Sequence, residues 1–470
     1  MASSKKGKFL IDNMVEINTK FIPAEPGIFI VGGTVRDILM GKQPTDFDIA
    51  AASPCAALAR RIAEKAGSRV ITLGKPGLSI YRVVSGNLTF DIAPIAAGGI
   101  ASDLRRRDFT VNAMAWDIYH QSLIDPLNGR ADLRERRIRM VHPQNLQTDP
   151  VRLLRAFRFG AALAFFIDDE TKNAIRSNSI SIRQAPGERI REEWLKMLAC
   201  SEAWPYIREM EETGLLTEIL PELAPLKQCH QNRRHALDVF DHTMAAFSSL
   251  EGLLHHPDPV FQKNRNLAMA AVAAPNRLKL ALLLHDIGKP ACRRVDENGS
   301  VHFFGHESLS AEMSQSVSRR LKLSNHHRAY LDFIIRHHLA PLFLFIDHQK
   351  QKLKRKIITR FFLKSAPLTI DLLIHAIADA RGKKPGQPAD EFEQFCGQLM
   401  AAYFFEFQPR AKNPPLITGE DLIKEIHLTP SPLFATLLAR VEEQRLTGRL
   451  RTRSQALKWV KNFLMHNKGP

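Results

Sequence analysis

The segment VGGTVRDILMGKQPTDFDIA, residues 31–50, carries two aspartates, Asp46 and Asp48, at the start of an apolar run. Side chains alternate along a strand, so a strand that begins here points both carboxylates to the same face. Neighbouring carboxylates bind Mg²⁺ readily and can hold two ions that stabilise the attacking and leaving oxygens of an in-line phosphoryl displacement. The pair is therefore typical of nucleotidyl-transfer chemistry.

The same segment contains a diglycine turn, Gly32 and Gly33, after the apolar residues 28–31. Glycines allow a backbone to come close to a triphosphate, and amide N–H groups at a helix start face its oxygens. A diglycine or an Asp-x-Asp pair alone is weak evidence, because both occur by chance. Here all the parts fall within about twenty residues in the order that the reaction needs, which favours the functional interpretation.

Four segments together resemble one known family. Residues 31–50 resemble the first motif of the bacterial-type tRNA nucleotidyltransferase and poly(A) polymerase family, within the DNA polymerase beta-like superfamily. Three further segments resemble later motifs of that family in the same order: LRRRDFTVNAMA at 104–115, TDPVRLLRAFRF at 148–159 and ERIREE at 188–193. The joint match spans residues 28 to about 225 and is highly specific.

The resemblance implies a set of site residues in this part of the chain. Asp46 and Asp48 are the expected catalytic metal ligands, and Asp91 is a weaker candidate for a third carboxylate, because a lone strand aspartate is more often a surface residue. Arginine guanidinium groups offer forked, permanently charged donors to phosphate and ribose oxygens. The expected nucleotide-binding residues are Gly33, Arg36, Arg106, Arg107, Asp108, Asn112, Asp149, Arg152, Arg155 and Arg158.

Asp149 and Arg152 are three residues apart, so on one helix they would share a face. A carboxylate accepts from an exocyclic amine and a guanidinium donates to ring acceptors, so this pair can recognise a Watson–Crick edge. The resemblance implies that the pair selects CTP and ATP. An ordinary ion pair on a helix surface is the alternative. Thr148 stands where the family often has Glu, so the support of the pair can differ here.

A second group of candidate ligands lies between residues 229 and 385. The His285-Asp286 pair follows an apolar run, and imidazole and carboxylate groups from other helices can complete a metal shell. The set resembles the HD-superfamily metal-dependent phosphohydrolases, although any one of these histidines alone would more often be structural. The expected ligands are His242, His285, Asp286, His306, His337 and Asp379; His255, His256, His326, His327 and His338 are left unassigned.

The chain is expected to have an α+β nucleotidyltransferase head of the DNA polymerase beta-like type, followed by an all-helical neck, an HD-type body and a helical tail. Strands are predicted at 27–31, 47–50, 69–73, 80–84 and 88–93, where apolar residues form short runs. The expected segments are 1–27, an N-terminal extension; 28–145, the head; 146–225, a nucleotide-selecting and RNA-binding neck; 226–388, the HD domain; and 389–470, a tail with RNA contacts.

Composition is consistent with a nucleic-acid partner. Lys and Arg total 66 against 49 Asp and Glu, which gives a formal charge of +17 and favours a polyanion. Five scattered cysteines form no Cys-x-x-Cys pair, which indicates reduced thiols and argues against a zinc knuckle. Uninterrupted apolar runs such as 280–284 are too short to span a bilayer, so a cytoplasmic protein without a membrane is expected.

The expected function is template-independent addition of CMP, AMP or both to the 3′ end of tRNA, with CTP and ATP as substrates and Mg²⁺ in the head. The HD site would take a divalent transition metal or Mg²⁺ and act as a phosphohydrolase. Family members that add all of C, C and A resemble one another in a longer flexible loop between a strand and the Arg-Arg-Asp motif, so the short segment 95–102 implies, through the resemblance, a CC-adding enzyme. The alternatives are a poly(A) polymerase that uses ATP alone, and an HD phosphohydrolase whose head only binds RNA.

Overall fold

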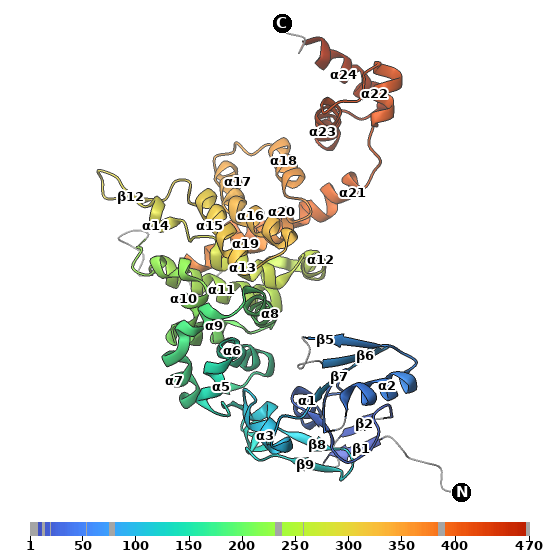
Figure 1. Cartoon of the computed structure of the whole chain (residues 1–470). Coiled ribbons are helices and arrows are strands. Elements are labelled where there is room, and N and C mark those ends of the chain that lie inside the picture. Colours follow the sequence, from blue (N-terminus) through green and yellow to red (C-terminus); the bar gives the residue numbers. More distant parts are fainter. Residues whose placement is uncertain are drawn as a thin grey trace. The chain divides into compact units, whose positions relative to one another are not determined.

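The chain forms two compact units, Met1–Pro221 (unit 1) and Glu222–Pro470 (unit 2) (Figure 1). The structure is a computed structural model, and it describes residues 8–11, 15–18, 20–52, 54–74, 80–230, 237–256, 258–383 and 391–466. Unit 1 carries a mixed sheet followed by helices, and unit 2 is mainly helical (Figure 1).

A seven-stranded sheet with the order β5-β6-β7-β4-β3-β8-β9 forms the first part of unit 1. β4 and β7 are parallel, and the other neighbouring pairs are antiparallel. A short hairpin, β1 (Lys8–Ile11) and β2 (Val15–Asn18), precedes this sheet. The strands of the sheet are β3 (Ile28–Val31), β4 (Asp46–Ala51), β5 (Val70–Leu73), β6 (Ile80–Ser85), β7 (Leu88–Pro94), β8 (Ala115–Asp117) and β9 (Ser122–Ile124).

The central strand β4 separates an apolar face from a polar one. Phe47 and Ile49 belong to the core that also contains residues of α1 (Gly33–Leu39) and α2 (Cys55–Ala66). Because side chains alternate along a strand, Asp46 and Asp48 point to the opposite face. Burial of the apolar face therefore fixes the direction of both carboxylates, since a register shift of one residue would exchange the two faces.

Helices form the rest of unit 1. Trp194 and Phe157 are fully buried there, and they anchor the packing of α8 on α6. The helices are α3 (Gly99–Arg105), α4 (Gly129–Arg134), α5 (Pro143–Thr148), α6 (Val151–Leu163), α7 (Asp169–Asn178), α8 (Gly187–Leu198), α9 (Trp204–Glu212) and α10 (Leu215–Ile219). A two-residue parallel pair, β10 (Arg137–Ile138) and β11 (Phe166–Ile167), links the segment after α4 to the segment after α6.

Unit 2 is a helical body with one short hairpin, β12 (Arg294–Val295) and β13 (Val301–His302). The helices of the body are α11 (Val239–His255), α12 (Arg265–Ala271), α13 (Pro275–Leu284), α14 (Lys289–Cys292), α15 (His306–Arg320), α16 (Asn325–His337), α17 (Ala340–Gln349), α18 (Arg355–Ser365), α19 (Thr369–Lys383) and α20 (Glu391–Ala402). α20 continues through a π-helix, η5 (Tyr403–Phe407), into α21 (Gln408–Ala411). The last helices, α22 (Gly419–Ile426), α23 (Leu433–Leu446) and α24 (Arg453–His466), share a small apolar core.

One helical stretch, Asn325–Gln349, is long and apolar enough to cross a membrane by composition alone, and two bent helix pairs pass the same test. The stretch combines α16 and α17. Side chains of this stretch make contacts within unit 2. The Tyr330 hydroxyl donates to Asp371 at 2.5 Å, and α16 packs against α13 and α15.

The five predicted strands are present, each with ends within one residue of the expected positions. The change from a mixed sheet to helices is also observed, and it occurs after β9. The expected boundary at 388 lies outside the described residues, and the other expected boundaries stay predictions.

Candidate active site and metal centre

The carboxylates of the first site lie on the parallel pair of strands. Asp48 on β4 is in register with Asp91 on β7, and Asp46 is two residues before Asp48 on the same face. Asp91 is held by Arg82 on the next strand, whose Nε and Nη2 donate at 2.7 and 2.6 Å. The structure therefore brings together the three acidic residues that the sequence nominated, and Arg82 is a partner that it did not.

Asp48 lies in a strongly charged environment. Desolvation by the surrounding protein raises the pKa of its carboxyl group; Arg107 opposes that shift, and Asp91 and Asp46 add to it. The Thr34 hydroxyl donates to the Asp46 carbonyl at 3.1 Å and accepts from the Asp48 amide at 3.0 Å. Thr34 therefore ties the start of α1 to the strand that carries both aspartates.

Gly32 makes room for Arg107 beside these carboxylates. Its φ of +70° is a conformation that favours glycine, and a Cβ there would lie 2.6 Å from Arg107 Nη1 and 3.4 Å from an Asp48 oxygen. The diglycine turn thus lets a guanidinium reach the carboxylate face. Gly33 is the first residue of α1, where a Cβ would lie 3.4 Å from Arg36.

A chain of polar contacts joins α1 to α6. Arg36 Nη1 donates to the Asn112 side chain at 2.6 Å, and the Asn112 amide donates to Asp108 at 3.2 Å. Asp108 also accepts from Arg155 on α6 at 2.8 Å. Four of the expected nucleotide-binding residues therefore form one network. The Arg106 side chain is exposed, and its carbonyl accepts from Arg152 at 2.8 Å.

Three arginine side chains lie beside the ring of Phe159 on α6. The guanidinium of Arg158 lies 3.5 Å from its ring centre, and those of Arg36 and Arg155 lie at 5.2 and 5.3 Å. Arg158 also donates to Glu193 of the 188–193 motif at 2.7 Å. The aromatic face and Glu193 therefore allow several arginines to gather, despite their mutual repulsion.

Asp149 and Arg152 face each other, although the expectation of one shared helix is wrong. Asp149 has extended backbone angles at the end of α5, Pro150 follows it, and α6 begins at Val151. Arg152 Nε still lies 3.7 Å from Asp149 Oδ2. Proline disfavours helical angles in the preceding residue, which places Asp149 before the helix rather than on it.

Arg189 on α8 is a partner that the sequence did not identify. Its two terminal nitrogens donate to both Asp149 oxygens at 2.9 and 2.8 Å. Burial opposes ionisation of Asp149, but the Arg189 guanidinium holds the pKa of this carboxyl group below its ordinary value. Arg152 Nη1 donates to the Arg106 and Asn145 carbonyls at 2.8 and 3.1 Å. Hydrogen bonds with other residues therefore orient both Asp149 and Arg152.

The second site is a buried cluster in the body of unit 2. His242 Nε2 lies 2.8 Å from Asp379 Oδ1, and His285 Nε2 lies 3.3 Å from the same oxygen and 3.1 Å from Asp286. His306 Nε2 lies 3.3 Å from the other Asp286 oxygen. Asp286 therefore belongs to two groups of metal-type ligands, and within each group the ligand atoms lie within 4.8 Å of one another.

Two glycines allow this cluster to form. A Cβ on Gly382 would lie 2.9 Å from the His242 carbonyl oxygen, so glycine lets α19 approach α11 and brings Asp379 to His242. A Cβ on Gly288 would lie 2.9 Å from the His306 carbonyl oxygen, so glycine also lets the His285-Asp286 turn approach α15. The ligand atoms, buried and composed of imidazole and carboxylate groups, fit a divalent metal.

The histidine expected from α16 is corrected from His337 to His338. His338 is buried, and its Nε2 lies 3.4 Å from His306 Nε2. His337 is turned away: its Nδ1 contacts the Phe333 carbonyl at 2.8 Å and its ring stacks on Phe333. Successive helical side chains diverge by about 100°, so only one of two adjacent histidines can face the cluster. Burial lowers the pKa of His338 to about 3, which leaves the neutral imidazole that binds metals.

His375 is a further buried histidine that the sequence did not identify. Its ring centre lies 5.1 Å from that of His285 and 5.8 Å from that of His338. It stands four residues before Asp379 on α19, a spacing that places both on one helix face. This four-residue spacing from Asp379 was the signal in the sequence that could have identified His375.

Asp286, His306, His338 and Asp379 of this cluster line a cavity of about 390 Å³. Lys289 and Lys383 line it, with Lys289 Nζ 2.6 Å from Asp286 and Lys383 Nζ 3.1 Å from Asp379. Phe304 and Phe343 also line the cavity and are 78% and 60% exposed. An anion that entered this cavity would meet two ammonium groups beside the carboxylates.

Three family models match successive parts of the chain. They describe a poly A polymerase head domain at residues 28–139, a probable RNA and SrmB-binding site of polymerase A at 164–227, and an HD domain at 239–384.

Relatives and solved structures match nearly the whole chain. An A-adding tRNA nucleotidyltransferase from Deinococcus radiodurans is 32% identical, over 95% of this chain and 98% of its own length. A CC-adding tRNA nucleotidyltransferase from Thermus thermophilus is 31% identical, over 94% of each. The structure of a CCA-adding enzyme with CTP has the same fold, with a TM-score of 0.62 and 21% identity over 93% of this chain and 91% of that one.

The correction on α16 predicts a difference between two neighbouring variants. His338→Ala should lower the affinity for Mn²⁺ or Ni²⁺ by at least about tenfold, because it removes a buried imidazole of the cluster. His337→Ala is the matched control and should leave that affinity unchanged. Calorimetric titration of each metal into the full chain measures both. Equal loss in the two variants, or loss only in His337→Ala, would contradict the assignment.

Proposed function

Because this chain belongs to the tRNA nucleotidyltransferase and poly(A) polymerase family, we propose that it extends tRNA 3′ ends through the site on β4 and β7. It is a nucleotidyltransferase that adds nucleotides to tRNA without a template. The observation that carries the site assignment is the set of three carboxylates, Asp46, Asp48 and Asp91, on one face of a parallel strand pair.

In the proposed reaction the RNA 3′ oxygen attacks the α-phosphorus of a nucleoside triphosphate. A new phosphodiester bond forms, the bond to the bridging oxygen of pyrophosphate breaks, and the proton of the hydroxyl group is released. Two Mg²⁺ held by Asp46 and Asp48 would activate that hydroxyl and stabilise the leaving oxygen. Arg107, which reaches over Gly32, would bind phosphate oxygens beside the carboxylates.

Asp149 and Arg152 are proposed to choose the base. Cytosine and adenine both present an amine at their Watson–Crick edge, where uracil and guanine present a carbonyl. Asp149 would accept from that amine and Arg152 would donate to the neighbouring ring nitrogen. Arg189 occupies both Asp149 oxygens in this structure, so a bound base would replace part of that ion pair.

Partial CC addition is the proposed subtype. Only residues 95–98 separate β7 from α3, so the segment that precedes the Arg-Arg-Asp motif is short. In this family a longer flexible loop at that place is expected to help the site change to ATP. The relatives named above include both an A-adding and a CC-adding enzyme, so the proposal rests on the loop. We place the enzyme in the cytoplasm, with its tRNA substrate.

A metal-dependent phosphohydrolase is proposed as a second activity. Asp286 and Asp379 lie among His242, His285, His306 and His338, and two lysines line the same cavity. A divalent metal held there would polarise a phosphate and acidify a water molecule. Lys289 and Lys383 would bind phosphate oxygens as point charges. A 2′,3′-cyclic phosphate end, which blocks nucleotide addition, is a suitable substrate.

The main assay uses tRNA that lacks its last three nucleotides, one labelled nucleoside triphosphate at a time, and sequencing of the product ends. We expect two C additions from CTP and little A addition to tRNA that ends in CC. Efficient A addition to that tRNA would reject the CC-adding subtype. No addition by the wild-type protein would reject the proposed use of the β4–β7 site.

Asp48→Asn should lower CMP addition by at least about 10³-fold, because it removes a charge that holds the metals, worth several kcal/mol in the transition state. The amide keeps the shape of the side chain, so the melting temperature should change little. Asp169→Asn, in an exposed residue of α7, is the matched control and should be fully active. Normal incorporation by Asp48→Asn would refute the site.

Base choice should depend on the Asp149 carboxylate. Asp149→Ala should lower the preference for CTP over UTP by about tenfold, since the lost hydrogen bond contributes about 1–2 kcal/mol to discrimination. The ratio of kcat/KM for the two nucleotides measures it. Glu192→Ala, in an exposed residue of α8, is the control. A ratio unchanged in Asp149→Ala would mean that other residues recognise the base.

The second activity is tested on 2′,3′-cyclic AMP and p-nitrophenyl phosphate with each divalent metal in turn. Wild-type protein should hydrolyse at least one substrate, and Asp286→Asn should lose this hydrolysis while it retains CMP addition. If neither protein hydrolyses either compound, or both do so equally, the cluster is not the site of hydrolysis.

A further inference from the structure

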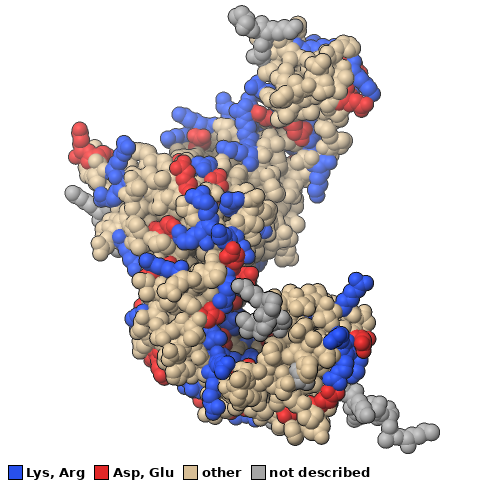
Figure 2. Space-filling model, viewed as in Figure 1, with Lys and Arg blue, Asp and Glu red and all other residues tan. Residues whose placement is uncertain are grey.

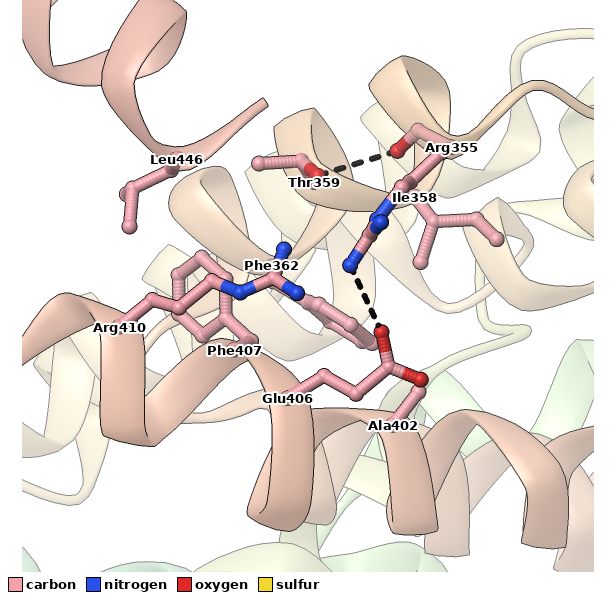
Figure 3. A pocket seen from close by; sticks show the side chains of 9 residues that line it. All are labelled: Arg355, Ile358, Thr359, Phe362, Ala402, Glu406, Phe407, Arg410 and Leu446. Atoms are coloured by element: carbon pink, nitrogen blue, oxygen red, sulfur yellow. Dashed lines mark hydrogen bonds and ion pairs between the residues drawn. The ribbon is translucent and has the colours of Figure 1, made fainter. Parts of the chain in front are cut away.

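The charged side chains of unit 2 illustrate two ways in which a polar group is stabilised. Figure 2 shows many Lys and Arg side chains on the surface, where water hydrates them. In a second cavity, of about 350 Å³, whose walls do not include the metal cluster, Arg355 donates to Glu406 at 3.0 Å (Figure 3). A polar side chain that is both buried and unpaired therefore needs an explanation of its own.

His375 on α19 is such a side chain. It is fully buried, and neither of its ring nitrogens has a hydrogen-bond partner among the residues that the structure describes. Its neighbours along α19, Leu372, Leu373 and Ala376, are buried and apolar. A nitrogen that loses its hydrogen bond to water without a replacement destabilises the fold. A leucine at this position would avoid that cost, so packing alone does not account for the histidine.

The ring of His375 lies as close to His285 as the rings of other cluster histidines lie to one another. The ring centres of His375 and His285 are 5.1 Å apart, and their planes cross at 79°. The ring centres of His242 and His285 are 6.0 Å apart, and those of His306 and His338 are 5.3 Å apart. Two imidazoles that bind one ion through nitrogens at about 2.1 Å have ring centres about 5 Å apart, so this spacing suits a shared ion.

His375 also lies beside both groups of metal-type ligands. His285 belongs to one group and His338 to the other, and the His375 ring centre is 5.1 Å from the first ring and 5.8 Å from the second. Burial lowers the pKa of His375 well below its ordinary value, so its ring is neutral and keeps a lone pair. This imidazole therefore has a lone pair, no protein partner in the described structure and a position next to the cluster.

We propose that His375 is a further ligand of the metal centre, in addition to the residues of the two ligand groups. An added imidazole favours Ni²⁺, Co²⁺ or Zn²⁺ over Mg²⁺, which prefers carboxylate and water oxygens. His375 therefore directs the centre toward a transition metal and away from the Mg²⁺ proposed for the head. The inference deepens the proposed phosphohydrolase site and rests on metal binding there, whichever phosphate the site hydrolyses.

Calorimetric titration of Ni²⁺ and of Mg²⁺ into the metal-free full chain tests this assignment. All proteins carry Asp48→Asn, so that the head contributes little metal binding. His375→Leu should weaken Ni²⁺ binding by at least about tenfold and change Mg²⁺ binding by less than about twofold. His375→Gln should weaken Ni²⁺ binding to the same extent, because an amide forms hydrogen bonds but is a poor ligand for Ni²⁺. His326→Leu, in an exposed histidine of α16, is the matched control for surface imidazoles.

The melting temperature gives an independent readout. Without metal, His375→Leu should melt at the same temperature as the parent protein or at a higher one, because leucine removes two unpaired nitrogens from the interior. Added Ni²⁺ should raise the melting temperature of the parent more than that of His375→Leu, because a ligand stabilises the folded state according to its affinity. A histidine needed only for packing would show the reverse pattern, with a lower metal-free melting temperature and unchanged Ni²⁺ affinity.

The inference is overturned if His375→Leu binds Ni²⁺ as tightly as His326→Leu, if His375→Gln keeps full affinity, or if the parent protein binds no divalent metal. A protein that binds Ni²⁺ through His375 but hydrolyses neither 2′,3′-cyclic AMP nor p-nitrophenyl phosphate would refute the proposed phosphohydrolase alone. A protein that hydrolyses one of these compounds, and whose His375 variants bind Ni²⁺ normally, would refute the role of His375 alone.

Discussion

Three carboxylates on neighbouring strands of unit 1 repel one another, and the charged groups around them offset that repulsion. Asp46, Asp48 and Asp91 lie on one face of β4 and β7 because the opposite face of β4 is buried in the core with α1 and α2. Like charges so placed destabilise one another unless cations lie between or beside them. The fold supplies Arg82 to Asp91 and Arg107 to Asp48, and it leaves Asp46 and Asp48 open to further cations. The negative charge on this face therefore favours the binding of metal ions and the presence of positively charged groups that can hold a triphosphate.

The same principle explains why so many arginines gather near α6. Each guanidinium there is balanced by an acid from another element: Arg155 by Asp108, Arg158 by Glu193 and Arg189 by Asp149. Glu193 comes from α8, Asp108 from the segment after α3, and Asp149 from the end of α5. The proposed nucleotide-binding groups are therefore oriented by contacts between different elements, so the positions of these side chains depend on how α6 and α8 pack.

The sequence predicted the carboxylate face well because it depends only on alternation along a strand and on which face is apolar. It could not choose between His337 and His338, since both occupy the end of the same helix and only packing decides which one turns inward. Residue spacing alone predicted that Asp149 and Arg152 share a helix. Pro150 disfavours helical backbone angles in the residue before it, so Asp149 lies outside α6. Arg189 was missed as a partner, although its motif was recognised, because a contact across 40 residues depends on how α8 packs on α6.

The two ligand clusters differ in a way that bears on their chemistry. Asp46 and Asp48 are exposed on an open face, whereas His285, Asp286 and His338 are buried in a helical body. An oxygen-rich, open site suits Mg²⁺, which keeps several waters and arrives with the phosphates of its substrate. A buried site of imidazole and carboxylate groups suits a metal that stays bound, because its ligands are desolvated and fixed by surrounding helices. With metals bound in this way, the head would exchange its ions with each nucleotide, while the body would retain its ion. The proposed phosphohydrolase would then not compete with nucleotide addition for the same metal.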